Sequence, residues 1–193
     1  MVTDYSDVKL ETKDLILKKA EFEDWKTIYY NLWRYKESAK YMLWQPTETD
    51  EDAKDRMKRT IAFEEKPENK YALFVYLKKT GEAIGFAGMR ELERGIYEET
   101  GIALGPEFVR KGYGRQILTA LLEEAGKQGA KEFHACNRTG NAASRALQLS
   151  CGFVFDSFRW ICGHNALLSV YKSGYHWLYT HHITNGNHLS IFF

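Results

Sequence analysis

The sequence predicts an α/β (α+β) protein with a single mixed, mostly antiparallel sheet flanked by helices. Three observations lead to this prediction. The hydrophobic period changes from helical to strand-like near residue 70, and two short turns then separate three strand-like runs. A glycine-containing turn joins the third run to an amphipathic helix, and another short strand follows. Short turns indicate antiparallel neighbours, whereas a strand–helix–strand unit indicates a parallel pair.

Composition predicts one globular domain over residues 1–193. This length suits one sizeable core and is short for two domains. Hydrophobic residues make up 44% of the chain and aromatic residues 15%, which favours a packed core over disorder. The formal net charge is +1 with intermixed signs, and no apolar run is long enough to cross a bilayer. We therefore expect no nucleic-acid partner and no membrane partner.

The start of the chain and its cysteines predict a cytoplasmic protein. Residues 1–7 are polar and acidic, unlike a signal peptide. The three cysteines form no C-x-x-C pair, which favours a reducing compartment over a disulfide framework. Five of the six histidines lie from His164 onward, without a metal-binding motif, so no metal site is expected.

The first seventy residues contain one predicted strand and two predicted helices. Alternation of apolar residues predicts the strand, and apolar residues at helical spacing predict the helices. A proline ends the aromatic connection between the helices, and Thr49 or Asp50 is the expected cap of the second helix. In order, these segments are the strand Leu10–Lys19, the helix Glu21–Arg34, the connection Lys40–Pro46 and the helix Glu51–Phe63.

The remainder of the chain contains the predicted strand-rich part of the sheet. Turns that contain glycine separate its runs, and Gly152 stands where a helix commonly ends. The expected strands are Tyr71–Leu77, Ala83–Glu91, Tyr97–Leu104, Lys131–Cys136, Phe153–Cys162 and Ala166–Lys172, and the expected helices are Arg115–Lys127 and Asn141–Ser150.

Residues 104–115, Leu-Gly-Pro-Glu-Phe-Val-Arg-Lys-Gly-Tyr-Gly-Arg, are the most informative stretch. A helix N-terminus carries unpaired N–H groups and partial positive charge, and glycines let a ligand approach the backbone closely. The pattern therefore predicts a phosphate cradle. It is not a nucleotide P-loop, because Arg115 and Gln116 replace the lysine and the hydroxyl residue. It is not a dinucleotide fingerprint, because Ile117 replaces the third glycine.

The cradle resembles the pyrophosphate loop of the GCN5-related N-acetyltransferases, whose pattern is Arg/Gln-x-x-Gly-x-Gly/Ala. Val109 stands at the first position here, a mild departure because the loop acts mainly through its backbone amides. The resemblance extends over about 10–172, and the opening strand is similar to that of the ribosomal-protein N-terminal acetyltransferase subgroup. Leu149–Phe153 resembles the glycine–phenylalanine end of the family's fourth helix.

The resemblance implies acetyl-CoA as co-substrate and assigns residues to it. In the family, the backbone late in the fourth strand and the loop hold the thioester and the diphosphate. In the subgroup, two asparagines and a serine contact the pantetheine arm and the phosphates. As isolated residues, the asparagines would be interpreted as a turn residue and an N-cap, and their register with the glycine loop favours the cofactor contact instead. The positions of this chain are Ile102, Ala103, Leu104, Val109, Arg110, Lys111, Gly112, Tyr113, Gly114, Arg115, Asn137, Asn141 and Ser144.

Two adjacent glutamates are the candidate catalytic bases. Acetyl transfer to an amine requires removal of a proton before attack. The resemblance implies that the backbone N–H of Leu104 donates to the thioester oxygen. Alternation places Glu98 on one face of its strand with Thr100, Ile102 and Leu104, whereas Glu99 matches the subgroup pattern Glu-x-Gly. Either glutamate could instead be a solvated strand-edge residue. Many relatives carry a tyrosine acid where this chain has Gln148, so no acid is assigned.

The expected acceptor site lies on the connection between the first two helices, where the family binds its amine. Trp33, Tyr41, Met42 and Trp44 could line an apolar slot there or form a small aromatic core under a loop. Beyond about residue 172 the resemblance ends, and the aromatic segment Tyr175–Phe193 reads as a hairpin around Asn185-Gly186. It would pack on its own sheet or on a second subunit, so a homodimer is possible.

The resulting prediction is an N-acetyltransferase that moves acetyl from acetyl-CoA to a primary amine by direct attack in a ternary complex. The amine belongs to a protein N-terminus or to a small molecule. The alternative is a non-catalytic acyl-CoA-binding or sensing protein with the same fold, which Gln148 would favour.

Overall fold

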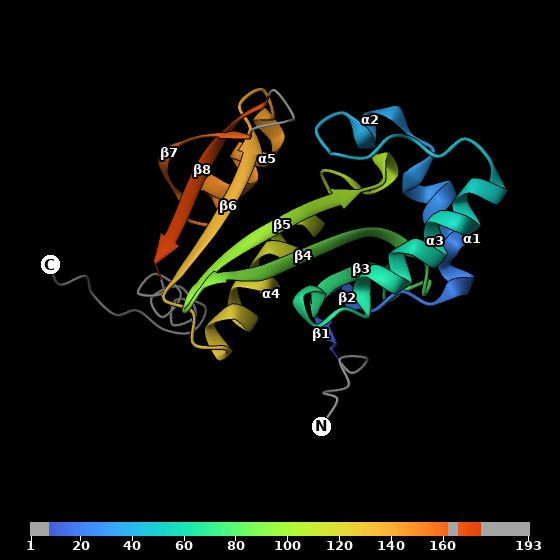
Figure 1. Cartoon of the computed structure of the whole chain (residues 1–193), viewed down its shortest axis with the longest axis horizontal. Helices are drawn as coiled ribbons and strands as arrows, with labels where there is room; N and C mark the ends of the chain where they lie inside the picture. The colour runs from blue at the N-terminus through green and yellow to red at the C-terminus, as the bar shows by residue number, and fades with distance from the viewer. Residues whose placement is uncertain (1–7, 162–165, 175–193) are drawn as a thin grey trace, which may run out of the picture.

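A single mixed sheet organises the chain in the computed structural model, which describes residues 8–161 and 166–174 (Figure 1). Within these residues eight strands pair in the order β1-β2-β3-β4-β5-β6-β8-β7. All neighbours are antiparallel except β5 and β6, which run parallel. The predicted fold class is therefore confirmed. The strands are β1 Leu10–Glu11, β2 Leu15–Lys18, β3 Tyr71–Leu77, β4 Ala83–Glu93, β5 Ile96–Leu104, β6 Glu132–Arg138, β7 Val154–Ile161 and β8 Ala166–Gly174.

The helices lie on both faces of the sheet. One face is covered by α4, and the other by α1 and α3, as Figure 1 shows. The predicted helix over Glu21–Arg34 consists of a 3₁₀ turn, a short α-helix and a π-helical turn in succession. The helices are α1 Trp25–Ile28, α2 Lys36–Ala39, α3 Asp50–Glu64, α4 Tyr113–Lys127 and α5 Ala142–Ser150, and the π-helical turn is Tyr29–Trp33.

The single first strand expected over Leu10–Lys19 is wrong, because this segment forms a hairpin. β1 and β2 pair antiparallel, with Leu10 opposite Leu17. Thr12 closes the turn by accepting a hydrogen bond from the backbone N–H of Leu15 at 3.0 Å. Gln116 of α4 accepts from the Thr12 hydroxyl at 2.7 Å, so the hairpin is attached to the helix that follows the glycine loop.

The choice of cap at α3 is settled by a hydrogen bond. The side chain of Thr49 accepts from the backbone N–H of Asp52 at 3.1 Å, as an N-cap residue does. Asp50, the other predicted cap, is the first residue of the helix. α3 buries Ala53 and Met57 against the sheet, in agreement with the apolar stripe that predicted it.

Two hydrophobic clusters fill the space on either side of the sheet. The cluster beneath α4 includes Met89, Tyr97 and Leu121, and the cluster beneath α1 and α3 includes Trp33 and Phe74. Both clusters use residues of β4 and β5. The central strands are therefore fixed on both faces, which holds the end of β5 in place.

Glu64 is an ionisable group buried at the end of α3. It is 4% exposed, and its carboxylate accepts from the backbone N–H of Ala20 at 2.8 Å. Burial raises the pKa of Glu64 from 4.5 to about 7, although the Ala20 hydrogen bond and the charge of Lys19 oppose the rise. The folded protein thus binds this proton more tightly than the unfolded chain does. The stabilisation from the protonated form is complete below pH 4.5 and is lost as pH rises through about 7.

Replacement of Glu64 by glutamine is therefore expected to stabilise the protein at pH 8. The gain has an upper bound of about 3 kcal/mol, set by the size of the pKa rise, and it disappears toward pH 4.5. Thermal melts of the variant and the parent between pH 5 and 8 would measure it. The exposed neighbour gives the control, Glu65→Gln. An equal response of both variants, or a Glu64→Gln protein that melts below the parent at pH 8, would contradict the argument.

Candidate active site

The sheet opens between β5 and β6 immediately after a short region of pairing. The two strands pair at only three positions, Ile96 with Glu132, Tyr97 with Phe133 and Glu98 with His134, and then diverge (Figure 1). The edge of β5 from Glu99 onward therefore faces a gap instead of a strand among the described residues. Backbone groups and side chains along this edge are available to a ligand inserted between the two strands.

The N–H of Leu104 points into this gap. The next residue, Gly105, donates its backbone N–H to the oxygen of Ile84 on β4 at 3.0 Å. Successive N–H groups of a strand point to opposite edges, so that of Leu104 is directed away from β4. This orientation suits the donor to a thioester oxygen that the sequence predicts at this position.

A bulge in β5 changes which residues share a face. Gly88 is opposite Gly101 and Met89 is opposite Glu99, so Thr100 is an extra residue in β5. Directly opposed residues lie on the same face, and Met89 belongs to the core beneath α4. Ile102 and Leu104 pack against that same core. The prediction that Glu98 shares a face with Ile102 and Leu104 is therefore wrong, and Glu99 occupies the α4 side with them.

The two glutamates have different environments. Glu98 is 8% exposed and pairs with Arg90, whose Nη2 lies 3.3 Å from its Oε1. Glu99 stands where β5 and β6 begin to separate. Burial, and next to it the charge of Glu98, raises the pKa of Glu99 to about 8, although a backbone hydrogen bond from Gly101 opposes the rise. Glu99 is thus half-protonated near pH 8 and mostly protonated at pH 7, and a pKa in this range suits a group that accepts and returns a proton.

The glycine loop connects the open end of β5 to α4. After the 3₁₀ turn Pro106–Phe108, Arg110 takes a left-handed conformation (φ 59°), and Gly112 follows with φ 81°. Gly112 is the N-cap residue of α4, without a side-chain cap, and the first turn carries no acidic residue. A Cβ on Gly112 would meet no atom within 4 Å. The leading N–H groups of α4 are therefore accessible to an anion, as the sequence predicts.

Gln148 links Asn137 to Ser144, and Ser144 is in turn hydrogen-bonded to Asn141. The Nδ2 of Asn137 donates to Gln148 at 2.7 Å, and the Nε2 of Gln148 donates to the Ser144 hydroxyl at 3.4 Å. Asn141 caps α5 by accepting from the backbone N–H of Ser144 at 3.1 Å. The buried Oδ1 of Asn137 has no partner among the described residues, so it can accept a hydrogen bond from a bound amide N–H.

Gln148 has an organising role that sequence reasoning missed. It is 1% exposed and links β6 to α5, whereas the sequence identified it only as a residue that cannot supply a proton. The signal was present in the spacing, because Ser144 and Gln148 are four residues apart on one helix and therefore adjacent on its surface.

The four predicted acceptor residues lie in four different settings. Trp33 is 1% exposed in the core, beneath the surface. Tyr41 donates its hydroxyl to the oxygen of Gly140 at 3.0 Å, which connects the α2–α3 loop to the loop before α5. Met42 lies against Gly101 of β5, 3.4 Å from where a Cβ would stand. Trp44 packs against Phe86 with ring centroids 6.4 Å apart and also lines a cavity.

That cavity was not predicted. It has a volume of about 520 Å³ and lies between α3 and the segment that precedes it. Arg56 and Arg59 line it together with Trp44 and Thr47. The two arginines look like ordinary surface residues of an amphipathic helix, and no feature of the sequence places residues 44–48 beside them.

The described residues contain neither a group of side chains that could hold a metal ion nor a helix long and apolar enough to cross a membrane. Five of the histidines considered in the sequence, His164, His176, His181, His182 and His188, lie outside the described residues. The aromatic segment Tyr175–Phe193 also lies outside them, and the homodimer predicted from that segment therefore stays a prediction.

An open sheet with a glycine loop at the split defines an acyl-CoA-dependent transferase fold. Residues 14–154 match the family described as "Acetyltransferase (GNAT) domain". The chain therefore belongs to the GNAT acetyltransferases, which are acetyl-CoA-dependent acyltransferases, and the predicted family, enzyme class and co-substrate are confirmed. Comparison with curated proteins finds no match.

Solved structures of the same fold include a GNAT-family acetyltransferase from Bacillus anthracis, at 17% identity and a TM-score of 0.72, covering 86% of this chain and 98% of that one. A putative ribosomal-protein-serine acetyltransferase from Vibrio cholerae matches at 18% identity and a TM-score of 0.70, covering 88% and 98%. The microcin C7 self-immunity acetyltransferase MccE, in complex with acetyl-CoA and AMP, matches at 20% identity and a TM-score of 0.69, covering 84% and 93%.

Proposed function

We propose that the protein transfers the acetyl group of acetyl-CoA to a primary amine by direct attack in a ternary complex, with Glu99 as general base. The single observation that carries this proposal is the position of Glu99, with its raised pKa, at the start of the β5–β6 gap that Leu104 also faces. Glu99 takes a proton from the acceptor ammonium, and the free amine then attacks the thioester carbonyl, so that the N–C bond forms and the C–S bond breaks, with CoA leaving as the thiolate. The N–H of Leu104 donates to the thioester oxygen as it gains negative charge.

The binding residues for the co-substrate follow from the same geometry. The open first turn of α4, with Gly112, Tyr113 and Gly114, would hold the diphosphate through backbone N–H groups. Asn137 would accept a hydrogen bond from the pantetheine arm through its unpartnered Oδ1. Water would return the proton to the thiolate, because the amide of Gln148 cannot supply one at neutral pH.

The pKa of Glu99 favours an α-amino group as the acceptor. Proton transfer works best between groups of similar pKa, and an α-amine titrates at about 7.7–8.0 whereas a lysine side chain titrates near about 10.4. Glu99, at about 8, matches the former. A peptide N-terminus or the α-amine of a small molecule is therefore the expected substrate class.

Thiol release with a panel of amines tests this function. Incubation with acetyl-CoA should release CoA with peptide N-termini or small α-amines, and more slowly with amines that resemble the lysine side chain. Melting temperatures with CoA, acetyl-CoA, ATP and NAD measure binding separately. A ligand present at 100 times its Kd adds about 2.7 kcal/mol, which is several degrees for this chain. Stabilisation by CoA without turnover of any amine would instead support the acyl-CoA-binding alternative.

A further inference from the structure

The cavity between α3 and the 44–48 segment contains an arginine that forms no ion pair with any residue of 8–161 or 166–174. The guanidinium of Arg56 lies over two indole rings, 4.4 Å from the centroid of Trp33 and 4.5 Å from that of Trp44. Its Nη1 donates to the oxygen of Gln45 at 3.3 Å and to the hydroxyl of Thr47 at 3.0 Å. Among the described residues, its other nitrogens have no hydrogen-bond partner and no carboxylate lies within ion-pair distance.

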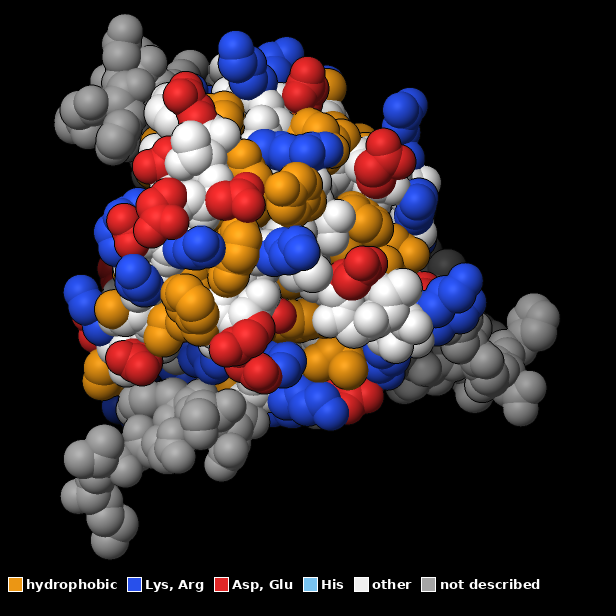
Figure 2. All heavy atoms as spheres, turned by 90° about the vertical axis from the view of Figure 1, so that its right-hand side faces the viewer, with side chains coloured by type: hydrophobic (Ala, Val, Ile, Leu, Met, Phe, Trp, Pro, Cys, Tyr) orange, Lys and Arg blue, Asp and Glu red, His pale blue; other side chains and the backbone are white. Residues whose placement is uncertain are grey.

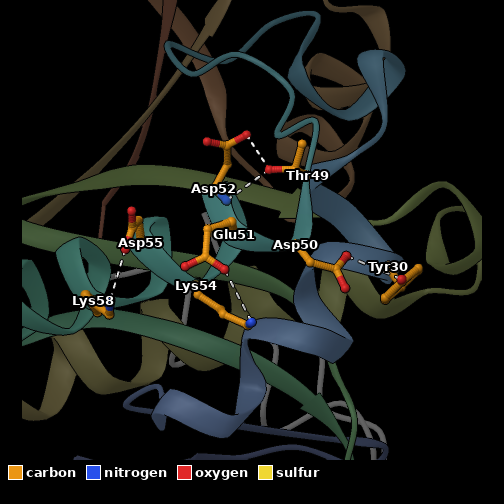
Figure 3. Close-up of polar contacts among 8 residues, drawn as sticks. All are labelled: Tyr30, Thr49, Asp50, Glu51, Asp52, Lys54, Asp55 and Lys58. Carbon is orange, nitrogen blue, oxygen red and sulfur yellow. Dashed lines mark hydrogen bonds and ion pairs between the residues drawn. The ribbon is translucent and has the colours of Figure 1, made fainter.

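The acidic residues nearest in sequence are already paired elsewhere, as Figure 3 shows. Asp52 accepts from the Thr49 hydroxyl at 2.6 Å, Glu51 pairs with Lys54 at 3.5 Å, and Asp55 pairs with Lys58 at 2.9 Å. Among the described residues, Arg56 therefore forms no ion pair, although its helix begins with three acids. Burial, and next to it the positive charge of Arg59, lowers the pKa of Arg56 to about 10.

The shape and chemistry of the cavity suit a planar monoanion. The rings of Trp33 and Trp44 hold the guanidinium plane, and a carboxylate can meet the remaining N–H donors in that plane. Glu48 and Asp52 also line the cavity, so a dianionic phosphate would experience more repulsion than a carboxylate would. Figure 2 shows that basic, acidic and apolar side chains are intermingled on the face that carries α1 and α3, so a specific pocket is needed to select an anion there.

The cavity is close to the open edge of the sheet. Its wall residue Trp44 packs on Phe86 of β4, and Phe86 is opposite Ala103, the residue before Leu104. One aromatic layer therefore separates the cavity from the strand that carries the reaction centre. A ligand extended from that strand across Trp44 would place a side chain against Arg56.

We propose that this cavity binds an acidic side chain of a peptide acceptor, with Arg56 as the residue that holds the carboxylate. This inference rests on the proposed function in one respect, namely that the bound peptide is an acceptor for acetyl transfer. Arg56 is a binding and specificity residue, not a catalytic one. It selects peptides that carry Asp or Glu close to the reacting amine.

Binding of a peptide that cannot be acetylated tests the cavity separately from catalysis. The probe is acetyl-Ala-Glu-Glu-Ala-amide, compared with its Gln-Gln counterpart at constant ionic strength, and the readout is tryptophan fluorescence, because Arg56 contacts two indoles. The acidic peptide should bind about tenfold more tightly, the effect of one hydrogen-bonded charge pair. In Arg56→Gln this preference should disappear, and in Arg56→Lys, which keeps the charge but not the planar fork, it should shrink.

The matched control is Lys58→Gln, which removes an exposed positive charge from the same helix outside the cavity. It should leave the preference unchanged. Thermal melting of each variant shows whether it is folded. If Arg56→Gln is not folded, Arg56→Lys is used for the binding comparison. Equal binding of both peptides to the parent, equal effects of the Arg56 and Lys58 variants, or binding of inorganic phosphate in place of the acidic peptide would overturn the proposal. Absence of acetyl transfer would leave this binding result unaffected.

Discussion

Glu99→Gln is expected to lower kcat by about a hundredfold to a thousandfold, the usual contribution of a general base. The amide is isosteric with the carboxyl group but cannot accept the proton of the acceptor ammonium. In the parent the pKa of Glu99 is raised to about 8, so the basic form is the minority below that pH. With saturating acceptor, kcat should therefore rise with pH and level off above about 8. The variant should lose this dependence on pH as well as most of its rate.

Glu98→Gln is the matched control for this experiment. It makes the same chemical change one residue away, on the opposite face of β5, where the carboxylate pairs with Arg90. Its kcat should fall by less than that of Glu99→Gln, and its pH profile should keep the parent shape. A larger loss in Glu98→Gln would transfer the role of base to Glu98, and the pairing with Arg90 would then become part of the mechanism.

Gly112→Val is expected to weaken CoA binding by about tenfold or more, because it should cost at least one charge-assisted hydrogen bond to the diphosphate. The position has φ 81° and open space around it, so the side chain would occupy the approach to the first N–H groups of α4. Valine at this backbone conformation also costs about 1–2 kcal/mol of stability. Calorimetric titration with CoA measures the first effect, and thermal melting measures the second.

Gly81→Val separates the two effects. Gly81 has φ 74°, also has no atom within 4 Å of a built Cβ, and lies in the β3–β4 turn away from the gap. The two variants should therefore lose similar stability, and only Gly112→Val should lose affinity for CoA. Equal CoA affinity in both variants and the parent would show that the diphosphate is not bound at the start of α4.

Features that depend on neighbours in the sequence could be predicted well. The strand Tyr71–Leu77 agrees at both ends, because periodicity is set within a few residues. Thr49, one of two candidate caps, and Asn141, for which a cap was the alternative to cofactor binding, both act as N-caps. The glycine loop belongs to the same class. Its left-handed Gly112 and the helix that follows are local consequences of the residues at 109–115.

Features that depend on distant partners could not be predicted. The first strand is interrupted by a turn that Thr12 and Leu15 close, and Gln116, about a hundred residues away, attaches that turn to α4 by accepting from Thr12. The cavity at Arg56 requires the 44–48 segment to return against α3, and the backbone N–H of Thr47 is held by the oxygen of Trp33 at 2.8 Å. The sequence left open whether Trp33 lines a slot or belongs to an aromatic core, because an apolar run does not indicate which side of a helix is covered, and Trp33 lies in the core.

Thr100 is an extra residue in β5. It interrupts the alternation by which successive side chains of a strand point to opposite faces of the sheet. A deletion of Thr100 that preserved the pairing on both sides would remove the bulge and restore regular alternation, with Glu99, Ile102 and Leu104 still on the α4 side. The shortened strand would instead lose the local bend and added twist that a bulge introduces, next to Glu99.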